Sequence, residues 1–316
     1  MAEIQFSAID DARVDDAPVG SDAVLQVRAI DHTYPNGVQA LVNVSIDVPR
    51  GLYGLLGPNG AGKSTLMRIL ATLQEPSAGS VVFDGIDVIA EPTHLRRLLG
   101  YLPQEFGVFP KVSAEELLDH LAVLKGIGPA RPRREQVHAL LQQTNLFDVR
   151  KRAVASFSGG MRRRFGIAQA LLGDPHLVIV DEPTAGLDPA ERVRFLDLLA
   201  EIGESVVVIL STHTLEDVSK LCPRLAILFN GRVVADGELA PLVAKLQGRV
   251  WRKPVARAEA DALRQAFDVV STRHADGRLI LHVLSDGSPG EGFEPVGGDL
   301  QDLYFAMTAE AEQAAA

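Results

Sequence analysis

Hydrophobic and polar residues follow two different periods along the chain. Residues 23–34 and 40–48 alternate between apolar and polar side chains, which is typical of antiparallel strands with one buried face. Shorter, mostly apolar runs predict strands that are buried on both faces. Strands are expected at residues 51–56, 80–85, 177–180 and 205–212. Helices are expected after or between them, at residues 63–73, 189–203 and 214–222.

This alternation of strands and helices predicts an α/β fold whose parallel sheet is covered on both faces. One stretch interrupts it, because residues 113–126 and 133–146 both have a helical pattern and no strand lies between them. Ser113 and Glu116, three residues apart, fit a capping box at the start of the first of these helices. We therefore expect a helical subdomain, over about residues 105–173, on one side of the sheet.

Both ends of the chain differ from this central region. Residues 1–22 are rich in Asp and Ala and predict a disordered acidic tail, with a regulatory arm as the alternative.

Residues 224–237 predict a hairpin that turns at Asn230 and Gly231. Beyond them, strands are expected at residues 249–255, 267–274 and 278–284, and a helix at residues 256–267. We expect a main domain over residues 23–240 and a small α+β accessory domain over residues 241–316.

Composition limits the classes of protein to consider. The chain has 316 residues, of which 47% are hydrophobic and 23% charged, as in soluble globular proteins with more than one domain. A net charge of −10 argues against nucleic-acid binding, which needs concentrated Lys and Arg. The single cysteine, Cys222, can form no internal disulfide, so a reducing cytosol fits. No apolar run reaches the roughly 20 residues that span a bilayer, so a location at a membrane would need a partner.

Residues 57–65, GPNGAGKST, match the phosphate-binding pattern G-x-x-x-x-G-K-[ST] and lie between a short apolar strand and a helix. The glycines let backbone N–H groups close around phosphates. Lys63 is placed to reach the β- and γ-phosphates, and the Ser64 hydroxyl to ligate Mg²⁺. A plain glycine-rich turn is the alternative, and the strand-loop-helix context argues against it. The expected nucleotide contacts are Gly57, Pro58, Asn59, Gly60, Ala61, Gly62, Lys63, Ser64 and Thr65.

Two adjacent acidic residues follow the apolar run at residues 177–180. Asp181 comes at the C-terminal end of a buried strand and is placed to hold Mg²⁺, directly or through water. Glu182 is placed to accept a proton from an attacking water molecule. A solvated loop is the alternative, but the strand delivers both carboxylates to the edge where α/β sheets bind ligands.

A second phosphate-facing element occurs far from the first. Residues 156–172, SFSGGMRRRFGIAQALL, indicate a turn and a helix that begins with Ser158, Gly159 and Gly160. The start of a helix leaves backbone N–H groups unpaired and attracts anions. The sequence therefore raises the question of which phosphate this second element meets.

Together these motifs resemble those of the ATP-binding subunits of ABC transporters, in the expected order over about residues 24–237. SGGMR, from Ser158, resembles the ABC signature, and AGLDP, with Asp188, resembles the D-loop. YLPQE, with Gln104, resembles the Q-loop, and STHT, with His213, resembles the switch loop. The resemblance implies a P-loop ATPase of the ABC type, with a parallel-sheet core, an antiparallel β subdomain and a helical subdomain.

The resemblance also implies roles for single residues. Gln104 would ligate Mg²⁺ and report the nucleotide state to the helical subdomain, instead of being a plain loop residue. His213 would contact the γ-phosphate and orient the attacking water, with packing at a strand end as the alternative. Tyr34 would stack on adenine, although a tyrosine before Pro-Asn-Gly also ends many hairpins. The expected catalytic residues are Glu182, His213, Gln104 and Lys63, and the expected Mg²⁺ ligands are Ser64, Gln104 and Asp181.

The signature departs from the usual family pattern, because Phe157 and Met161 replace the usual Leu and Gln. Met followed by arginines, and a C-terminal extension ending in DLQDLYFAMT, resemble subunits that energise drug, antibiotic or polysaccharide exporters of the ABC-2 type. Arg162, Arg163 and Arg164 have two interpretations. A solvated helix start is favoured over contact with a phosphate or an acidic partner surface, since arginine near a helix N-terminus opposes the helix dipole.

The resemblance implies a head-to-tail dimer of two copies. ATP and Mg²⁺ would lie between the phosphate loop of one subunit and Ser158, Gly159 and Gly160 of the other, and Asp188 would couple the two sites. A membrane permease would bind the Q-loop and helical subdomain and hold the subunit at the cytoplasmic face of the cell membrane, with export favoured over import. Two alternatives remain: a soluble ABC ATPase without a transport role, and a drug-sequestering ATP-binding protein.

Overall fold

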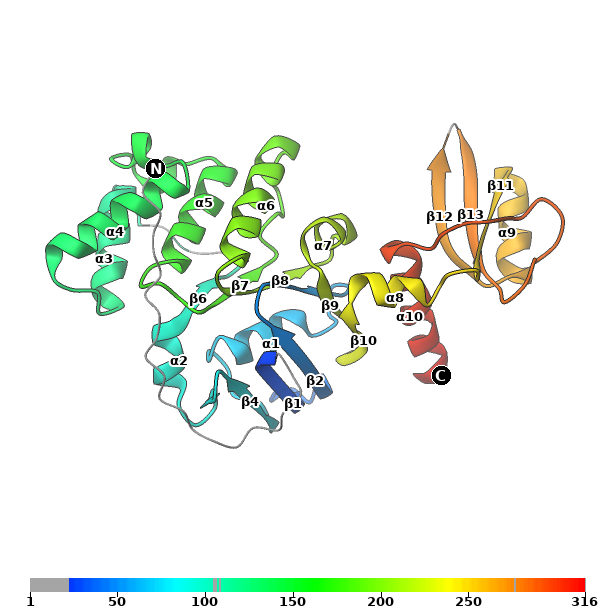
Figure 1. Cartoon of the computed structure of the whole chain (residues 1–316), viewed down its shortest axis with the longest axis horizontal. Coiled ribbons are helices and arrows are strands. Elements are labelled where there is room, and N and C mark those ends of the chain that lie inside the picture. The colour runs from blue at the N-terminus through cyan, green and yellow to red at the C-terminus, as the bar shows by residue number, and fades with distance from the viewer. Residues whose placement is uncertain (1–22, 105–106, 108, 276, 316) are drawn as a thin grey trace.

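The computed structural model describes residues 23–104, 107, 109–275 and 277–315, so the predicted tail at residues 1–22 lies outside the described residues. The described residues form three sheets, as Figure 1 shows. A six-stranded sheet forms the centre, and a four-stranded antiparallel sheet lies beside it. A second four-stranded antiparallel sheet stands near the C-terminus.

The central sheet has the strand order β10-β9-β3-β8-β7-β6. Its parallel strands are β9 (Arg224–Phe229), β3 (Leu52–Leu56), β8 (Val207–Thr212), β7 (Leu177–Asp181) and β6 (Leu99–Leu102). β10 (Arg232–Glu238) pairs antiparallel with β9 at one edge. The turn between them lies at Asn230 and Gly231, with φ angles of 46° and 74°, so the predicted hairpin is confirmed.

Alternate residues of the central strands enter two separate cores. Ile179 and Ile209 pack with α1 (Lys63–Leu70) and the antiparallel sheet on one face. Val180 and Leu210 pack on the other face, where the covering helices are α5 (Gly159–Ala170), α6 (Pro189–Gly203) and α7 (Leu215–Leu221). The predicted parallel sheet with two covered faces is therefore confirmed, and this burial explains why its strands have no polar face.

The antiparallel sheet beside the core has the order β2-β1-β4-β5. Its strands are β1 (Ala23–Thr33), β2 (Gln39–Pro49), β4 (Ala78–Phe83) and β5 (Ile86–Asp87). Leu25 and Ile46 from this sheet share a core with Leu66 of α1. α2 (Pro92–Leu98) then runs directly into β6. The sequence pattern predicts neither α2 nor β6, because both are too short to show a clear period.

α3 (Ala114–Leu124) and α4 (Ala130–Gln143) pack on α5, at the left of Figure 1. Two 3-10 turns, at Phe147–Val149 and Val154–Ser156, connect α4 to α5. Ser113 Oγ accepts a hydrogen bond from the Glu116 N–H at 3.3 Å, and the Glu116 carboxylate accepts one from the Ser113 N–H at 3.1 Å. The predicted capping box is therefore confirmed, and the bounds of the helical subdomain remain a prediction.

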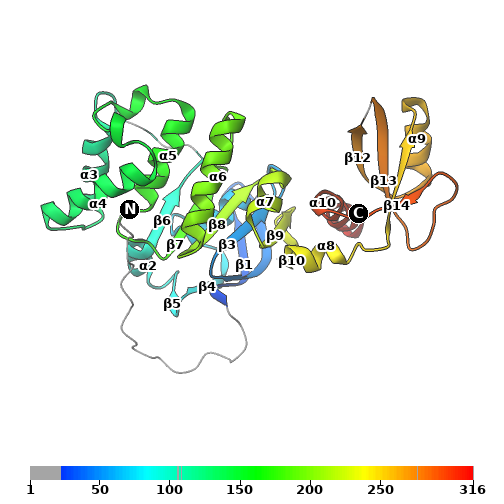
Figure 2. The same ribbon diagram turned by 45° about the horizontal axis from the view of Figure 1, so that its top comes forward.

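The third sheet has the order β12-β13-β11-β14, with β11 (Val250–Val255), β12 (Val269–Ala275), β13 (Arg278–Leu284) and β14 (Glu294–Pro295). α9 (Arg257–Ala266) packs on it through Ala260. α8 (Leu239–Ala244) and α10 (Leu300–Ala315) lie between this sheet and the central sheet, as Figures 1 and 2 show. Leu300 and Leu303 of α10 join the core of the central sheet. The sequence predicts no helix at α10, and the domain boundary at residue 240 remains a prediction.

A buried polar cluster fixes α10 to the third sheet. Asp302 of α10 is 0% exposed, and its carboxylate accepts hydrogen bonds from Ser271 Oγ at 2.6 Å and Arg273 Nη2 at 3.1 Å. His282 Nδ1 lies 3.1 Å from the same carboxylate. Burial alone would raise the pKa of Asp302, but the hydrogen bonds from His282 and Ser271 and the Arg273 charge outweigh it and lower the pKa to about 2.

We predict that Asp302→Asn lowers the free energy of unfolding by about 2–3 kcal/mol at pH 7, since a pKa lowered by about two units corresponds to that energy. The pKa is lower in the folded chain, so the stabilisation is present above about pH 4 and is lost as the pH falls toward 2, with about half remaining at pH 3. Urea unfolding of both proteins at pH 7, 5 and 3 measures the difference. A difference that stays constant from pH 7 to pH 3 would contradict the prediction.

Candidate functional site

Three neighbouring parallel strands end at the same edge of the central sheet. β3, β8 and β7 are adjacent, and their registers pair Leu56 with Thr212 and Asp181 with Ser211. The chain continues from these strands into the loop at residues 57–62, into Glu182 and into His213. Three distant parts of the sequence therefore meet at the carboxyl edge of a parallel sheet, where α/β folds bind ligands.

The loop at residues 57–62 is tightly packed, and glycines make this packing feasible. Gly62, the residue before α1, has a φ angle of 102°, and a Cβ there would lie 2.5 Å from the Ala40 carbonyl oxygen. A Cβ on Gly57 would lie 2.3 Å from the Leu228 carbonyl oxygen. No side chain caps α1 in the described structure, so the first N–H groups of this helix have no side-chain acceptor. Phosphate is the ligand that such a helix start accepts.

Lys63 lies inside this loop instead of in solvent. Its side chain is 5% exposed, and its ammonium donates hydrogen bonds to the carbonyl oxygens of Gly57 at 2.7 Å and Pro58 at 3.0 Å. Burial lowers the pKa of Lys63, and the charges of Glu182 and Asp181 act in the opposite direction. The ammonium thus lies between the phosphate loop and the carboxylates of Asp181 and Glu182 at the end of β7.

Glu182 has a charged or ionisable neighbour on each side. Its Oε1 lies 3.7 Å from Lys63 Nζ and 3.1 Å from His213 Nδ1. The Glu182 φ angle of 46° is left-handed, which costs energy for a residue with a side chain. Backbone strain of this kind is often found at functional sites. The chain therefore holds this carboxylate between a lysine and a histidine at some cost in backbone energy.

Asp181 is buried at the end of β7, and Ser211 Oγ donates a hydrogen bond of 2.7 Å to its carboxylate. The Ser211 carbonyl oxygen accepts the Glu182 N–H at 2.9 Å. Ser211 thus holds both acidic residues, through its hydroxyl and through its backbone. Sequence reasoning misses Ser211, and its place two residues before His213 is the signal that could have identified it.

Tyr34 lies beside the helix that follows the phosphate loop. Its hydroxyl is 2.9 Å from Thr65 Oγ1, and this hydrogen bond lowers the pKa of Tyr34. Its ring meets the His32 ring edge-on, with the centroids 4.7 Å apart. Tyr34 is therefore next to α1, and its stacking on adenine remains a prediction.

The signature and the D-loop are neighbours in the same chain. Ser158 caps α5, because its Oγ accepts a hydrogen bond from the Met161 N–H at 3.2 Å. A Cβ on Gly160 would lie 1.2 Å from Glu191 Oε2, so the Glu191 carboxylate fills the space of a side chain there. Asp188 caps α6 by accepting the Glu191 N–H at 2.9 Å. The helices that begin at these two motifs are therefore in direct contact.

The three arginines after the signature have different surroundings, so the favoured interpretation of a solvated helix start is wrong for two of them. Arg162 is exposed. Arg163 donates a hydrogen bond to the Gln104 carbonyl oxygen, while the Gln104 residue itself is exposed. Arg164 is largely buried and lies 3.7 Å from Glu191. These partners belong to the same chain, and the Glu191 carboxylate offsets the charge of Arg164, which would otherwise oppose the helix dipole.

Known proteins share these features. The family model for ABC transporters matches residues 41–185. The chain is 38% identical over 262 residues to the daunorubicin/doxorubicin resistance ATP-binding protein DrrA of Streptomyces peucetius, covering 81% of this chain and 79% of that protein. This chain belongs to the ABC transporter family. This ABC subunit is also 33% identical over 303 residues to the uncharacterized ABC transporter ATP-binding protein YxlF of Bacillus subtilis, covering 90% and 99% of the two chains.

Solved structures place the fold of this ABC subunit among ATP-binding cassettes. The bacterial cassette MJ0796, described as dimeric, matches with a TM-score of 0.63 at 27% identity over 68% of this chain and 98% of that one. Another structure of that cassette, in a post-hydrolysis state, is bound to ADP and Pi. The chain is therefore an ATP-binding subunit that hydrolyses ATP. None of its described helices has the length and hydrophobicity that a bilayer crossing requires.

We predict that Ser211→Ala lowers kcat for ATP hydrolysis by about 10- to 100-fold, because Asp181 loses the hydroxyl that orients it. ATPase rates over a range of Mg²⁺ concentrations measure the effect. Ser205→Ala, at an exposed residue before β8, is the matched control and should leave the rate unchanged. Equal rates for the two variants would contradict the role assigned to Ser211.

Proposed function

We propose that this ABC subunit powers export through a separate membrane permease, as one of two copies that close head-to-tail on two ATP molecules. The observation that carries the proposal is the Glu182 carboxylate between Lys63 and His213, beside the phosphate loop. These groups supply an acceptor for the proton of a water molecule and a cation for a phosphate within one small region.

The positions of the two phosphate-facing elements support the dimer. The phosphate loop opens α1, which packs on one face of the central sheet. The signature opens α5, which packs on the opposite face. Two elements on opposite faces of a sheet are poorly placed to share one phosphate group, so the second copy would supply Ser158, Gly159 and Gly160 to each nucleotide. The dimeric state described for the MJ0796 cassette supports the same arrangement.

The donors beside the loop fit Mg²⁺. This ion prefers octahedral oxygen ligands and is often held by one or two carboxylates together with phosphates and water. Asp181 offers a buried carboxylate at the end of β7, and Ser64 offers a hydroxyl in the first turn of α1. The described residues contain no group of three or more His, Cys, Asp or Glu side chains suited to a metal. When bound, Mg²⁺ would neutralise charge on the phosphates, with Gln104 as a further proposed ligand.

In the proposed reaction, catalysis depends mainly on the positioning of the reacting groups and on the stabilisation of charge. Glu182 would accept a proton from the attacking water, and His213 at 3.1 Å would hold both the carboxylate and the γ-phosphate in place. Lys63 and the first N–H groups of α1, which no side chain caps, would stabilise negative charge on the phosphate oxygens. Tyr34 would stack on the adenine, and Asp188 would contact the opposite subunit.

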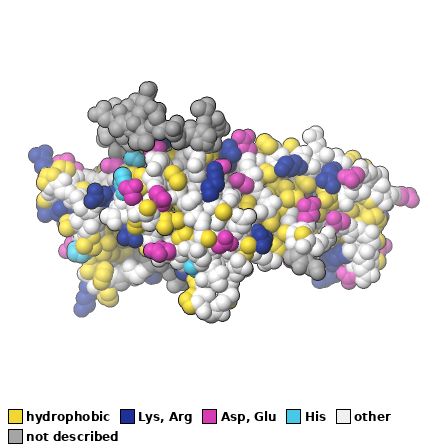
Figure 3. Space-filling model, turned by 90° about the horizontal axis from the view of Figure 1, so that it is seen from below, with side chains coloured by type: hydrophobic (Ala, Val, Ile, Leu, Met, Phe, Trp, Pro, Cys, Tyr) yellow, Lys and Arg dark blue, Asp and Glu magenta, His cyan; other side chains and the backbone are white. Residues whose placement is uncertain are grey.

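The likeness to DrrA, a protein named for resistance to daunorubicin and doxorubicin, supports export of an antibiotic or drug-like cargo. The face seen in Figure 3 mixes acidic and basic side chains instead of gathering Lys and Arg in one patch, and the net charge is −10, which both argue against a nucleic-acid partner. The permease would bind the Q-loop and the helical subdomain at the cytoplasmic face of the membrane.

We predict that this subunit pellets with membranes from its native cells and copurifies with an integral-membrane protein. When it is expressed without that protein, it should stay in the supernatant. Fractionation followed by mass spectrometry of the copurified material measures both outcomes. A subunit that remains in the supernatant of its native cells would favour the alternative of a soluble ABC ATPase.

We predict that Glu182→Gln binds ATP but hydrolyses it at least about 100-fold more slowly, because the amide cannot accept the proton. Since hydrolysis would open the dimer, this variant should accumulate as a dimer in gel filtration with ATP and Mg²⁺. Glu201→Gln, at an exposed residue of α6, should behave like the wild type. A Glu182→Gln monomer under these conditions, or wild-type turnover, would refute the assignment.

A further inference from the structure

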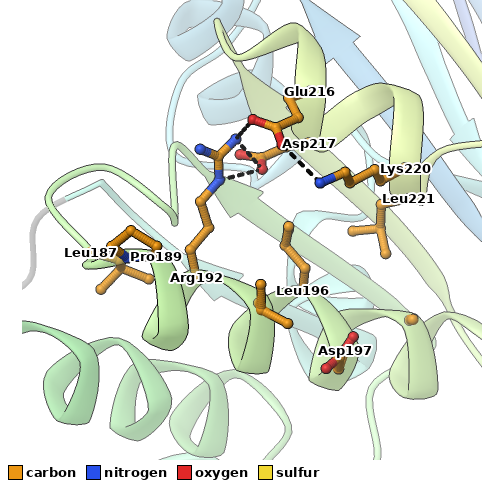
Figure 4. A pocket seen from close by; sticks show the side chains of 11 residues that line it. Leu187, Pro189, Arg192, Leu196, Asp197, Glu216, Asp217, Lys220 and Leu221 are labelled. Atoms are coloured by element: carbon orange, nitrogen blue, oxygen red, sulfur yellow. Dashed lines mark hydrogen bonds and ion pairs between the residues drawn. The ribbon is translucent and has the colours of Figure 1, made fainter.

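A buried carboxylate lies in α7, the helix that follows His213. Asp217 in α7 is 1% exposed, and no motif in the sequence assigns it a role. Its Oδ2 accepts a hydrogen bond of 2.7 Å from Thr184 Oγ1. Its Oδ1 accepts one of 2.7 Å from Arg192 Nε, and Arg192 Nη2 lies 2.6 Å from the same oxygen. Figure 4 shows Asp217 and Arg192 facing each other across the space between α6 and α7.

Asp217 and its two partners, Thr184 and Arg192, come from the three segments that carry the proposed catalytic machinery. Thr184 is two residues after Glu182, and Arg192 is four residues after Asp188. Asp217 itself is four residues after His213. One carboxylate thus joins the loop of the general base, the helix that follows the D-loop and the helix that follows the switch histidine.

We propose that Asp217 is a positioning residue that transmits movement of the D-loop helix to Glu182 and His213. This inference rests on the proposed function, in which the D-loop contacts the opposite subunit. Movement of α6 when the two copies close would shift Arg192, and the paired Asp217 would carry α7 and the Thr184 loop with it. ATP hydrolysis at each site then depends on correct docking of the opposite subunit.

The surroundings of Arg192 give this connection room to move. A cavity of about 530 Å³ lies between α6 and α7, and Arg192, Asp217 and Glu216 line it together with apolar residues. Arg192 Nη2 lies 3.6 Å from the Glu216 carboxylate, a second acceptor on the cavity wall. Lys220 donates a hydrogen bond of 2.7 Å to that same carboxylate. The guanidinium therefore has space and an alternative partner, whereas Asp217 is enclosed.

Stability alone is a weak reason for such a pair. Burying a charge such as the Asp217 carboxylate costs several kcal/mol of desolvation, and well-packed apolar residues often serve equally well for stability. A carboxylate with a hydrogen bond from arginine on one oxygen and one from a hydroxyl on the other instead fixes the relative orientation of three segments. This directional constraint is what a coupling between the D-loop and the catalytic residues requires.

The test is Asp217→Asn in the full chain, because the amide keeps the size of the side chain but removes the charge that Arg192 pairs with. We expect kcat for ATP hydrolysis to fall by about 10- to 100-fold, because small misplacements of catalytic groups lower rates by such factors. KM for ATP should change by less than about threefold, since the expected ATP contacts lie elsewhere. The rate should also lose any positive cooperativity in ATP concentration.

Asp302→Asn is the matched control. Asp302 is equally buried and also pairs with an arginine and a hydroxyl, but it lies in α10 and its partners lie in β12, away from the phosphate loop. Both variants should lower Tm, and the control should keep wild-type kcat and KM below its unfolding temperature. Wild-type kcat and cooperativity in folded Asp217→Asn would overturn the inference. If Asp217→Asn does not fold, Thr184→Val removes one hydroxyl and should lower kcat several-fold, and a wild-type kcat would overturn the inference equally.

A double variant separates this inference from the proposed function. Glu182→Gln with Asp217→Asn should still form the ATP-dependent dimer, because Asp217 acts on hydrolysis and not on closure. Failure of Glu182→Gln alone to dimerise would refute the proposed function. A dimer that forms with Glu182→Gln but is lost in the double variant would place Asp217 in dimer closure and overturn its assignment as a positioning residue for hydrolysis.

Discussion

Parallel pairing of β8 with β3 on one side and β7 on the other is the constraint on which the site depends. Parallel strands deliver the residues that follow them to one edge of the sheet, so strand direction alone brings the three loops together there. The register refines this placement, because Asp181 stands opposite Ser211 and the Ser211 hydroxyl reaches the carboxylate directly. A register shift of one residue would point each buried side chain of β8 to the opposite face of the sheet, and so into the wrong core. The hydrophobic pattern of these strands therefore sets the geometry of the site as well as the stability of the sheet.

Hydrophobic packing brings the remaining elements together, and the buried carboxylates of Asp302 and Asp217 fix their relative orientation. α10 packs through Leu300 and Leu303 into the core of the central sheet, and Asp302 on the same helix holds Ser271 and Arg273 of the third sheet. The orientation of the accessory sheet is thus linked to the catalytic domain through one helix. Asp217 has the same kind of partners between α6 and α7. In both places a charged hydrogen bond selects one arrangement among several that apolar contacts alone would allow.

The sequence predicts those parts of the molecule whose causes are local. A glycine loop between a strand and a helix, a capping box at Ser113 and a hairpin at Asn230 each depend on a few adjacent residues, and the fold contains all of them. α2 and β6 are too short to show a period, and α10 is held by residues from β12 and β13 that lie far away in the sequence. The partners of Ser211 and Asp217 are equally remote, at separations of about 30 residues. Such pairs follow from strand order and helix packing, which no single segment encodes, so the sequence located the motifs but not the residues that hold them in place.

The arginines of α5 show how one helix serves several motifs at once. Three positive charges at a helix start oppose the helix dipole, yet Arg163 binds the Gln104 carbonyl oxygen and Arg164 pairs with Glu191 against Gly160. The signature helix is therefore tied to the Q-loop on one side and to the helix after the D-loop on the other. In the proposed dimer, a phosphate that reaches Ser158 from the opposite subunit would act on a helix already connected to both. The signature, the D-loop and the surface proposed to bind the permease would then move as one unit. Asp217 would extend that unit to Glu182 and His213.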